Sequence, residues 1–154
     1  MPVADCPRVE EVLPHAGPMV FLSRVLSHTD DHTVCSVEID EQALFRDRTG
    51  NVPAWVGVEY MAQCIAAHAG LVGRASGAAP QIGLLLGSRR VGFYAACFHP
   101  GQTLVVKAHH VWGTSPGLLS FDCSLEDATT GARLAEGRLN CFVPDADYAE
   151  GGGW

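Results

Sequence analysis

The sequence predicts an α+β domain in which one long central helix is wrapped by a curved antiparallel sheet. The chain has 154 residues, of which 47% are hydrophobic, and this is enough for one domain with a sizeable core. The alanine-rich stretch at 53–75 is apolar on nearly every helical face, as in a helix that is buried on most sides. Strand-like runs precede and follow that stretch, so a sheet is available to surround the helix.

The segments before the central helix predict a short helix and a hairpin. Residues 8–13 (RVEEVL) have the length of one or two helical turns, and a proline-rich connection follows them. Residues 21–27 (FLSRVLS) read as a strand, and residues 32–39 (HTVCSVEI) alternate clearly. Asp30 and Asp31 lie between the two runs, so we expect a two-stranded hairpin that turns there.

The central helix and the segments after it complete the predicted domain. Pro53 suits the first helical position, where its missing N–H costs nothing, and Gly77 and Pro80 end the helix. Four further strands are expected to form an antiparallel meander, over residues 81–93, 103–112, 118–126 and 134–143. We expect a single domain over 1–154, with its core at about 8–144 and a loose tail at 145–154.

A small curled sheet leaves part of such a helix open, so we expect a second copy to cover it.

Composition limits the other partners. The chain has 10 basic and 17 acidic residues, for a net charge of −7, which argues against nucleic-acid binding. The apolar run at 55–72 contains Glu59, and a carboxylate is costly in a lone membrane span. Residues 1–12 lack a signal-peptide pattern, so we expect a cytoplasmic protein. The six widely spaced cysteines are expected to be reduced.

Glu59 is the first candidate for chemistry, because it lies one turn into an otherwise apolar helix. Desolvation there would raise its pKa and suit acid–base catalysis. The alternative interpretation is that Glu59 is a partly exposed first-turn glutamate, stabilised by the helix dipole. Gln63 lies four residues later on the same face, where it either bonds the carboxylate or a ligand, or is a satisfied buried amide. His68 lies off that face, and we interpret it as a core or interface histidine.

Three further candidates lie outside the helix. His15, between two prolines, either supplies a functional imidazole or fixes its loop. Arg89 and Arg90 in GSRRVG suit a phosphate such as that of a phosphopantetheine arm, or they form a solvated pair. The histidines lack metal-ligand spacing, and the adjacent His109 and His110 point to opposite faces of a strand, so no metal site is expected.

Three segments together resemble bacterial 3-hydroxyacyl-(acyl carrier protein) dehydratases. Residues 13–26 (LPHAGPMVFLSRVL) resemble the opening of these proteins, and residues 53–63 (PAWVGVEYMAQ) resemble their central-helix signature. Residues 98–104 (FHPGQTL) are similar to the turn that precedes one of their strands. The resemblance is colinear over about 12–143, and it is nearest to the dehydratase-like branch found beside aryl-polyene and related pathways.

The resemblance implies a hotdog fold that works as a dimer and removes water from a 3-hydroxyacyl thioester on an acyl carrier protein. In the family, a histidine abstracts the alpha proton while an acidic residue helps the hydroxyl leave, and the two come from different subunits. Glu59 is carried over as the acidic residue and Gln63 as its helix neighbour. No metal or organic cofactor is implied beyond the phosphopantetheine that carries the substrate. An acyl tunnel at the dimer interface is expected.

Backbone N–H groups near the helix start are expected to hold the thioester carbonyl, with Gly57 as the candidate by position. The full set of expected substrate contacts is Gln63, Gly57, Trp55, Arg89 and Arg90.

The chain departs from the family pattern where the catalytic histidine usually lies. A Gly-His-Phe-Pro-Gly stretch normally precedes the helix, but residues 45–51 read FRDRTGN, and no histidine occurs between His32 and Glu59. Either His15 replaces the base, or the chain supplies Glu59 to a composite site whose histidine comes from a second hotdog subunit. The alternatives are a hotdog thioesterase, in which the carboxylate activates water or attacks the carbonyl, and a non-catalytic partner of an active dehydratase.

Overall fold

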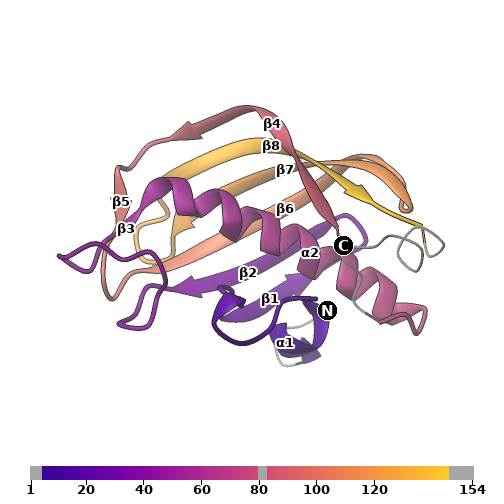
Figure 1. Cartoon of the computed structure of the whole chain (residues 1–154), viewed down its shortest axis with the longest axis horizontal. Helices are drawn as coiled ribbons and strands as arrows, with labels where there is room; N and C mark the ends of the chain where they lie inside the picture. The colour runs from indigo at the N-terminus through magenta and orange to yellow at the C-terminus, as the bar shows by residue number, and fades with distance from the viewer. Residues whose placement is uncertain (1–4, 80–82, 146–154) are drawn as a thin grey trace, which may run out of the picture.

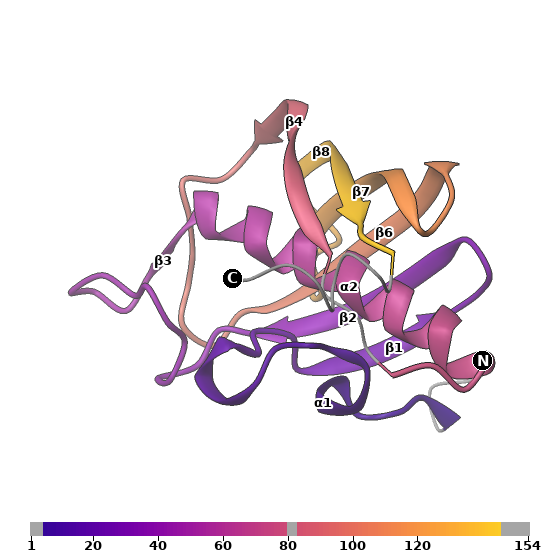
Figure 2. The same cartoon turned by 45° about the vertical axis from the view of Figure 1, so that its right-hand side comes forward.

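A computed structural model describes residues 5–79 and 83–145, and its architecture confirms the predicted hotdog fold. Six antiparallel strands form one sheet that curls around helix α2 (Gly57–Ala75), as Figures 1 and 2 show. The strands, in their order across the sheet, are β1 (Arg24–His28), β2 (His32–Glu38), β6 (Thr103–Gly113), β7 (Gly117–Asp127), β8 (Arg133–Val143) and β4 (Leu84–Phe93).

The predicted hairpin is confirmed as β1 and β2, which pair antiparallel across the turn at Asp30 and Asp31. The predicted meander is only partly right. Strands β6, β7 and β8 are sequential neighbours, but β4 pairs with β8 and forms an edge of the sheet. The chain leaves β4 at Phe93 and crosses to the other side of the helix before it enters β6 beside β2. The run predicted to begin at residue 81 forms a strand from Leu84; residues 81 and 82 lie outside the described part.

The start of the helix differs from the prediction. Pro53 does not begin an α-helix, because it belongs to β3 (Val52–Pro53), a two-residue strand that pairs with β5 (Cys97–Phe98). A short 3-10 helix, η3 (Ala54–Val56), then leads into α2. The β3–β5 pair is too short to show periodicity, so the sequence did not predict it. Pro80, predicted to end the helix, lies outside the described residues.

The core lies between α2 and the concave face of the sheet. Met61, Cys64 and Ala67 of α2 are fully buried, and the inward residues Leu104, Val106 and Ala108 of β6 are fully buried as well. The opposite side of the helix is left partly open by the chain's own sheet, as predicted. A stripe of apolar residues there is partly or largely exposed: Val58, Ala62, Ala66, Ala69 and Val72. We call these five residues the open stripe. The helix is therefore not buried on all sides within one chain.

The N-terminal segment covers the far end of the helix. Helix α1 (Val9–Val12) packs against α2 so closely that a side chain at Gly70 would overlap the backbone carbonyl of Val12. The chain then passes through the 3-10 turn η2 (Gly17–Met19) into β1. This route brings the loop that contains His15 back over the first half of α2.

The cysteines fit the prediction of reduced thiols, because no disulfide joins any of the six. Cys35, Cys64, Cys123 and Cys141 are buried, and burial raises the pKa of the Cys141 thiol to about 11. Such thiols are inert small hydrophobes. Among the described helices, none is long and apolar enough to cross a bilayer.

Candidate active site

Glu59 lies in the first turn of α2, beside the open stripe. An acidic residue in a first helical turn is stabilised by the partial positive charge of the helix N-terminus. Its side chain is 41% exposed, so within the single chain it is the partly exposed first-turn glutamate, one of the two alternatives that the sequence left open. The reason is that the sheet covers only the other side of α2. The carboxylate is therefore open to substrate or to a second subunit.

Gln63 holds that carboxylate and the neighbouring loop together. The residue is fully buried, and its amide nitrogen donates to Glu59 Oε1 at 3.3 Å and to the Met19 carbonyl at 2.7 Å. Its amide oxygen accepts from the backbone N–H of Phe21 at 2.9 Å. Because an unpaired buried amide is costly, these three bonds fix Gln63 and orient one oxygen of Glu59.

His15 is the one histidine, among the described residues, that lies within ion-pair distance of Glu59. Its Nε2 is 3.8 Å from Glu59 Oε1, which is longer than a hydrogen bond. Its Nδ1 is buried and has no hydrogen-bond partner within the described part of the chain. A proton on Nδ1 would leave a buried donor unpaired and would turn the Nε2 lone pair toward a carboxylate. The contacts therefore favour the tautomer whose Nε2–H points at Glu59.

Two expected substrate contacts at the helix start have different environments. The N–H of Gly57 donates to the carbonyl of Ala54, and its expected contact with a thioester carbonyl stays a prediction. Gly57 permits close packing, because a Cβ there would meet Leu125 and Phe98. Trp55 is 61% exposed and contacts Phe45, with ring centroids 6.0 Å apart.

Arg89 and Arg90 are not brought to Glu59 within the chain. Both lie on the exposed edge strand β4, whereas the loop that carries His15 lies beyond the opposite edge, beside β1 (Figure 1). Arg90 is opposite Arg138 of β8 in the strand register. The two arginines therefore remain candidates for a contact outside the Glu59 cluster.

A row of contacting aromatic side chains lies beside Glu59, and no pattern in the sequence predicted it. Trp55 contacts Phe45, Phe45 contacts Phe21, and Phe21 contacts Tyr60 edge-on at 6.0 Å. Phe45 has a φ of 66°, which is unusual for a bulky residue, and it begins the segment that replaces the family's histidine motif. Burial raises the pKa of Tyr60 to about 12, so its hydroxyl stays protonated near neutral pH.

A cavity of about 430 Å³ lies next to these aromatic side chains. Its lining joins three separate segments, namely η2 with the approach to β1, the end of β2 with the loop after it, and the start of α2. Phe21, Val56 and Tyr60 supply aromatic and apolar wall, while Glu38 and Asp40 are among its polar residues. Because three distant segments form it, no local pattern in the sequence marks it.

His68 is a core histidine, which confirms one of its two interpretations. It is 4% exposed, and its Nδ1 is 2.8 Å from Thr33 Oγ1, which is also 2.8 Å from His28 Nδ1. Its ring meets Phe121 edge-on at 5.5 Å. Burial, together with the smaller effects of His28 and His110, lowers the pKa of His68 to about 4. The ring is therefore neutral and structural at ordinary pH.

Comparisons with known proteins agree with this geometry. The ApeP-like family model, described as ApeP dehydratase, matches residues 7–151. The chain is similar to a subunit of the dehydratase heterocomplex ApeI:P from Xenorhabdus doucetiae, with a TM-score of 0.86 and 28% identity over 94% of this chain and 95% of that one. A search of curated proteins gave no match.

Hotdog thioesterases share the fold at lower identity. A hypothetical thioesterase with coenzyme A from Streptococcus pneumoniae has a TM-score of 0.61 and 15% identity, over 78% of this chain and 86% of that one. Zebra fish thioesterase superfamily member 2 has a TM-score of 0.63 and 16% identity, over 88% and 91%. These two show the fold alone, whereas the family model spans nearly the whole chain; the chain therefore belongs to the ApeP-like dehydratase family.

Proposed function

We propose that this dehydratase removes water from a 3-hydroxyacyl thioester on an acyl carrier protein, as the Glu59-bearing half of a site shared with a second hotdog subunit. The observation that carries the proposal is the placement of Glu59. Its carboxylate is oriented by a buried glutamine, is 41% exposed, and borders a helix face that the chain's own sheet does not cover. A partner on the open stripe would enclose the carboxylate and exclude water.

In this mechanism Glu59 is the general acid. The partner's histidine takes the alpha proton, the thioester carbonyl carries the developing negative charge, and protonated Glu59 gives its proton to the departing hydroxyl. The products are a 2-enoyl thioester and water, with the glutamate ionised and the histidine protonated. Proton return restores both groups, so the reaction needs no metal or organic cofactor.

His15 is assigned to positioning and not to proton abstraction. Because Nδ1 is buried without a partner, the proton that satisfies the ring best is the one on Nε2, which faces Glu59. An Nε2 that carries a proton cannot act as the base. The N–H instead helps to hold Glu59 in place, so the base must come from elsewhere. A proton on Nε2 therefore favours a composite site over a self-contained one.

The similarity to the ApeI:P heterocomplex supports a hotdog partner. Strand β4 offers one docking element, because it is a ten-residue edge strand with Leu85 and Leu86 exposed. Exposed apolar edge strands are prone to pair with another sheet. Pairing there and coverage of the open stripe would place the partner beside Glu59.

The carrier protein is proposed to supply the substrate through its phosphopantetheine arm. Arg89 and Arg90 on β4 have the guanidinium chemistry that suits the phosphate of this arm. They lie away from Glu59 within the chain, so a contact with the arm requires the assembled complex. The acyl chain itself is proposed to follow the apolar residues of the open stripe.

The test is a complementation assay with a carrier-bound 3-hydroxyacyl substrate. The purified chain is assayed alone, and then with a hotdog subunit that retains the Gly-His-Phe-Pro-Gly histidine, by the absorbance of the new double bond. We expect the chain alone to be at least about 100-fold slower than the mixture, because one partner of an acid–base pair is absent. Full turnover by the chain alone would contradict the composite site.

Release of free carrier thiol is followed in the same reaction. Thiol release without a new double bond would identify a thioesterase, in which Glu59 activates water. If the second subunit alone dehydrates the substrate at the full rate, this chain is a non-catalytic partner.

A further inference from the structure

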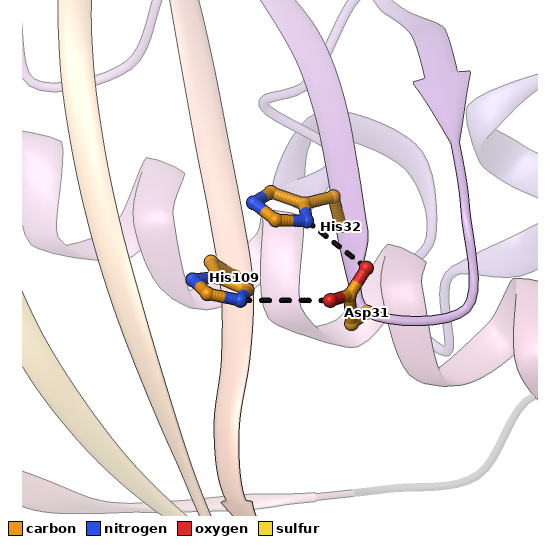
Figure 3. Close-up of side chains that lie close together, drawn as sticks. All are labelled: Asp31, His32 and His109. Atoms are coloured by element: carbon orange, nitrogen blue, oxygen red, sulfur yellow. Dashed lines mark hydrogen bonds and ion pairs between the residues drawn. The ribbon is translucent and has the colours of Figure 1, made fainter.

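We propose that Asp31, His32 and His109 bind a divalent transition-metal ion on the outer face of the sheet. Figure 3 shows the two imidazoles directed at opposite oxygens of one carboxylate. His32 Nδ1 lies 3.0 Å from Asp31 Oδ1, and His109 Nε2 lies 3.7 Å from Asp31 Oδ2. The three side chains place one ligand atom each within 4.8 Å of one another, and no other such group of three occurs among the described residues.

The spacing of these atoms suits an ion with short bonds to nitrogen and oxygen. In a tetrahedral zinc site with bonds of about 2.0–2.1 Å, neighbouring ligand atoms lie about 3.3–3.4 Å apart. The two observed nitrogen–oxygen separations, 3.0 and 3.7 Å, lie on either side of that value and end on different oxygens of Asp31. The side chains therefore rotate on binding, so that both nitrogens and one carboxylate oxygen face the ion. Imidazole nitrogens with one carboxylate favour Zn²⁺, Ni²⁺ or Cu²⁺ over Ca²⁺ and Mg²⁺, which prefer oxygen ligands alone.

The backbone holds the three ligands in place before an ion binds. His32 of β2 is directly opposite His109 of β6 in the strand register, and their rings stack 3.9 Å apart with an interplanar angle of 8°. The Asp31 carbonyl accepts from the His110 N–H at 2.8 Å, which ties the β1–β2 turn to β6. Thr29 Oγ1 donates to Asp31 Oδ1 at 3.1 Å. The strand register therefore fixes the backbone positions of the ligands, while the two imidazoles rotate out of their stack to direct both lone pairs at one ion.

The charges around the cluster also suit a cation. Asp31 supplies a carboxylate to the cluster, and its Oδ1 lies within hydrogen-bond distance of His32 Nδ1 and Thr29 Oγ1. Asp122, opposite His109 on β7, is paired with Arg138 through bonds of 2.8 and 3.1 Å. Asp122 is therefore committed elsewhere, and water would complete the coordination of the ion.

The ion would act on the fold and not on the dehydration reaction. His109 faces outward, while its neighbour Ala108 is buried under α2, so the sheet separates the cluster from the helix that carries Glu59. A metal bound there would link β2, β6 and the β1–β2 turn. We therefore expect thermal stabilisation without a change in turnover.

The test is calorimetric titration of the chelator-treated chain with Zn²⁺. We expect saturable binding of one ion per chain, weakened at least about tenfold in His32→Gln and in His109→Gln, since even indirect perturbation of a metal site often costs 10–100-fold. Zn²⁺ should raise the Tm of the wild type but not of these variants. His99→Gln is the matched control, because His99 is exposed and lies beside Cys97; it should bind Zn²⁺ as the wild type does.

The side chains of Asp31, His32 and His109 are 40–59% exposed, so the variants should fold; Asp31→Asn provides a second variant in the same site. Titration with Co²⁺ should show ligand-field bands without a thiolate charge-transfer band. The proposal is overturned by an absence of saturable binding, by wild-type affinity in both histidine variants, by loss of binding in His99→Gln, or by a thiolate band.

Discussion

The buried amide of Gln63 links Glu59 to the loop before β1, because its nitrogen donates both to Glu59 Oε1 at 3.3 Å and to the Met19 carbonyl at 2.7 Å. One side chain thus orients the proposed acid and anchors the segment that carries His15. The two residues joined by the Met19 bond are 44 positions apart in sequence. The same amide therefore fixes both the Glu59 carboxylate and the packing of the loop on α2.

Replacement of Gln63 by leucine tests that coupling. The change leaves the Phe21 N–H and the Met19 carbonyl without their partner, and each unpaired buried group costs about 1–3 kcal/mol. We expect the free energy of unfolding to fall by about 2–4 kcal/mol in a urea titration. Gln42→Leu, at an exposed position, should change it by less than about 0.5 kcal/mol. Equal effects of the two substitutions would contradict the assigned role of Gln63.

Variants at His15 separate positioning from proton abstraction. Glutamine can place an N–H near the position of Nε2, whereas leucine cannot. In the reconstituted complex we expect His15→Gln to keep most of kcat, and His15→Leu to lower it by about tenfold, in steady-state assays. Loss of a general base would cost about 10²–10⁴-fold in both variants, and that result would assign proton abstraction to His15.

Substitution of two glycines of α2 by alanine tests how closely α1 packs on this helix. A methyl group at Gly70 would overlap the Val12 carbonyl, while one at Gly73 would make ordinary contact with Ala78 at 3.5 Å. We expect Gly70→Ala to lower the free energy of unfolding by about 1–3 kcal/mol through overpacking. Gly73→Ala should raise it by about 0.5–1 kcal/mol, because alanine is the better helix former. Thermal melts of both variants check the pair, and a stabilising Gly70→Ala would show that α1 does not pack as described.

The buried His68 makes stability depend on pH. Its pKa is lowered to about 4 in the folded chain, against about 6.5 when unfolded. The unfolded chain therefore binds the extra proton between these values, so the stabilisation is complete above about pH 6.5 and is lost as pH falls toward 4. The total loss is about 3 kcal/mol.

Urea titrations at a series of pH values measure this loss in the wild type and in His68→Asn, which keeps a polar group near Thr33 but does not titrate there. Burial also lowers the pKa of His28, a residue that both proteins retain, so the difference between the two curves isolates His68. Parallel curves would contradict a buried neutral imidazole at this position.

Periodicity was sufficient to predict the elements that carry their own pattern. The helix around Met61, the hairpin at Asp30 and Asp31, and the strands after residue 100 each show an apolar repeat within one segment. The i, i+4 spacing likewise predicted that Gln63 would lie beside Glu59, and the structure places them within hydrogen-bond distance.

Features that depend on distant segments were not predictable from such patterns. The pairing of β4 with β8 and the two-residue β3–β5 ladder arise from the path of the chain across the sheet. The stacked pair His32 and His109 depends on the strand register between two residues that are far apart in the sequence. The exposure of Glu59 depends on which face of α2 the sheet covers, and a helix that is apolar on all sides does not reveal that face.

The most direct test of the central claim is the turnover of the reconstituted complex with Glu59→Gln, measured beside Glu41→Gln as an exposed control. Glutamine keeps the shape of the side chain but cannot give a proton to the leaving hydroxyl. If Glu59 is the acid of a shared site, turnover falls by about 10²–10⁴-fold while the two subunits still assemble, and the control is unchanged. Wild-type turnover in the Glu59→Gln complex would show instead that this chain only supports a partner that carries the whole site.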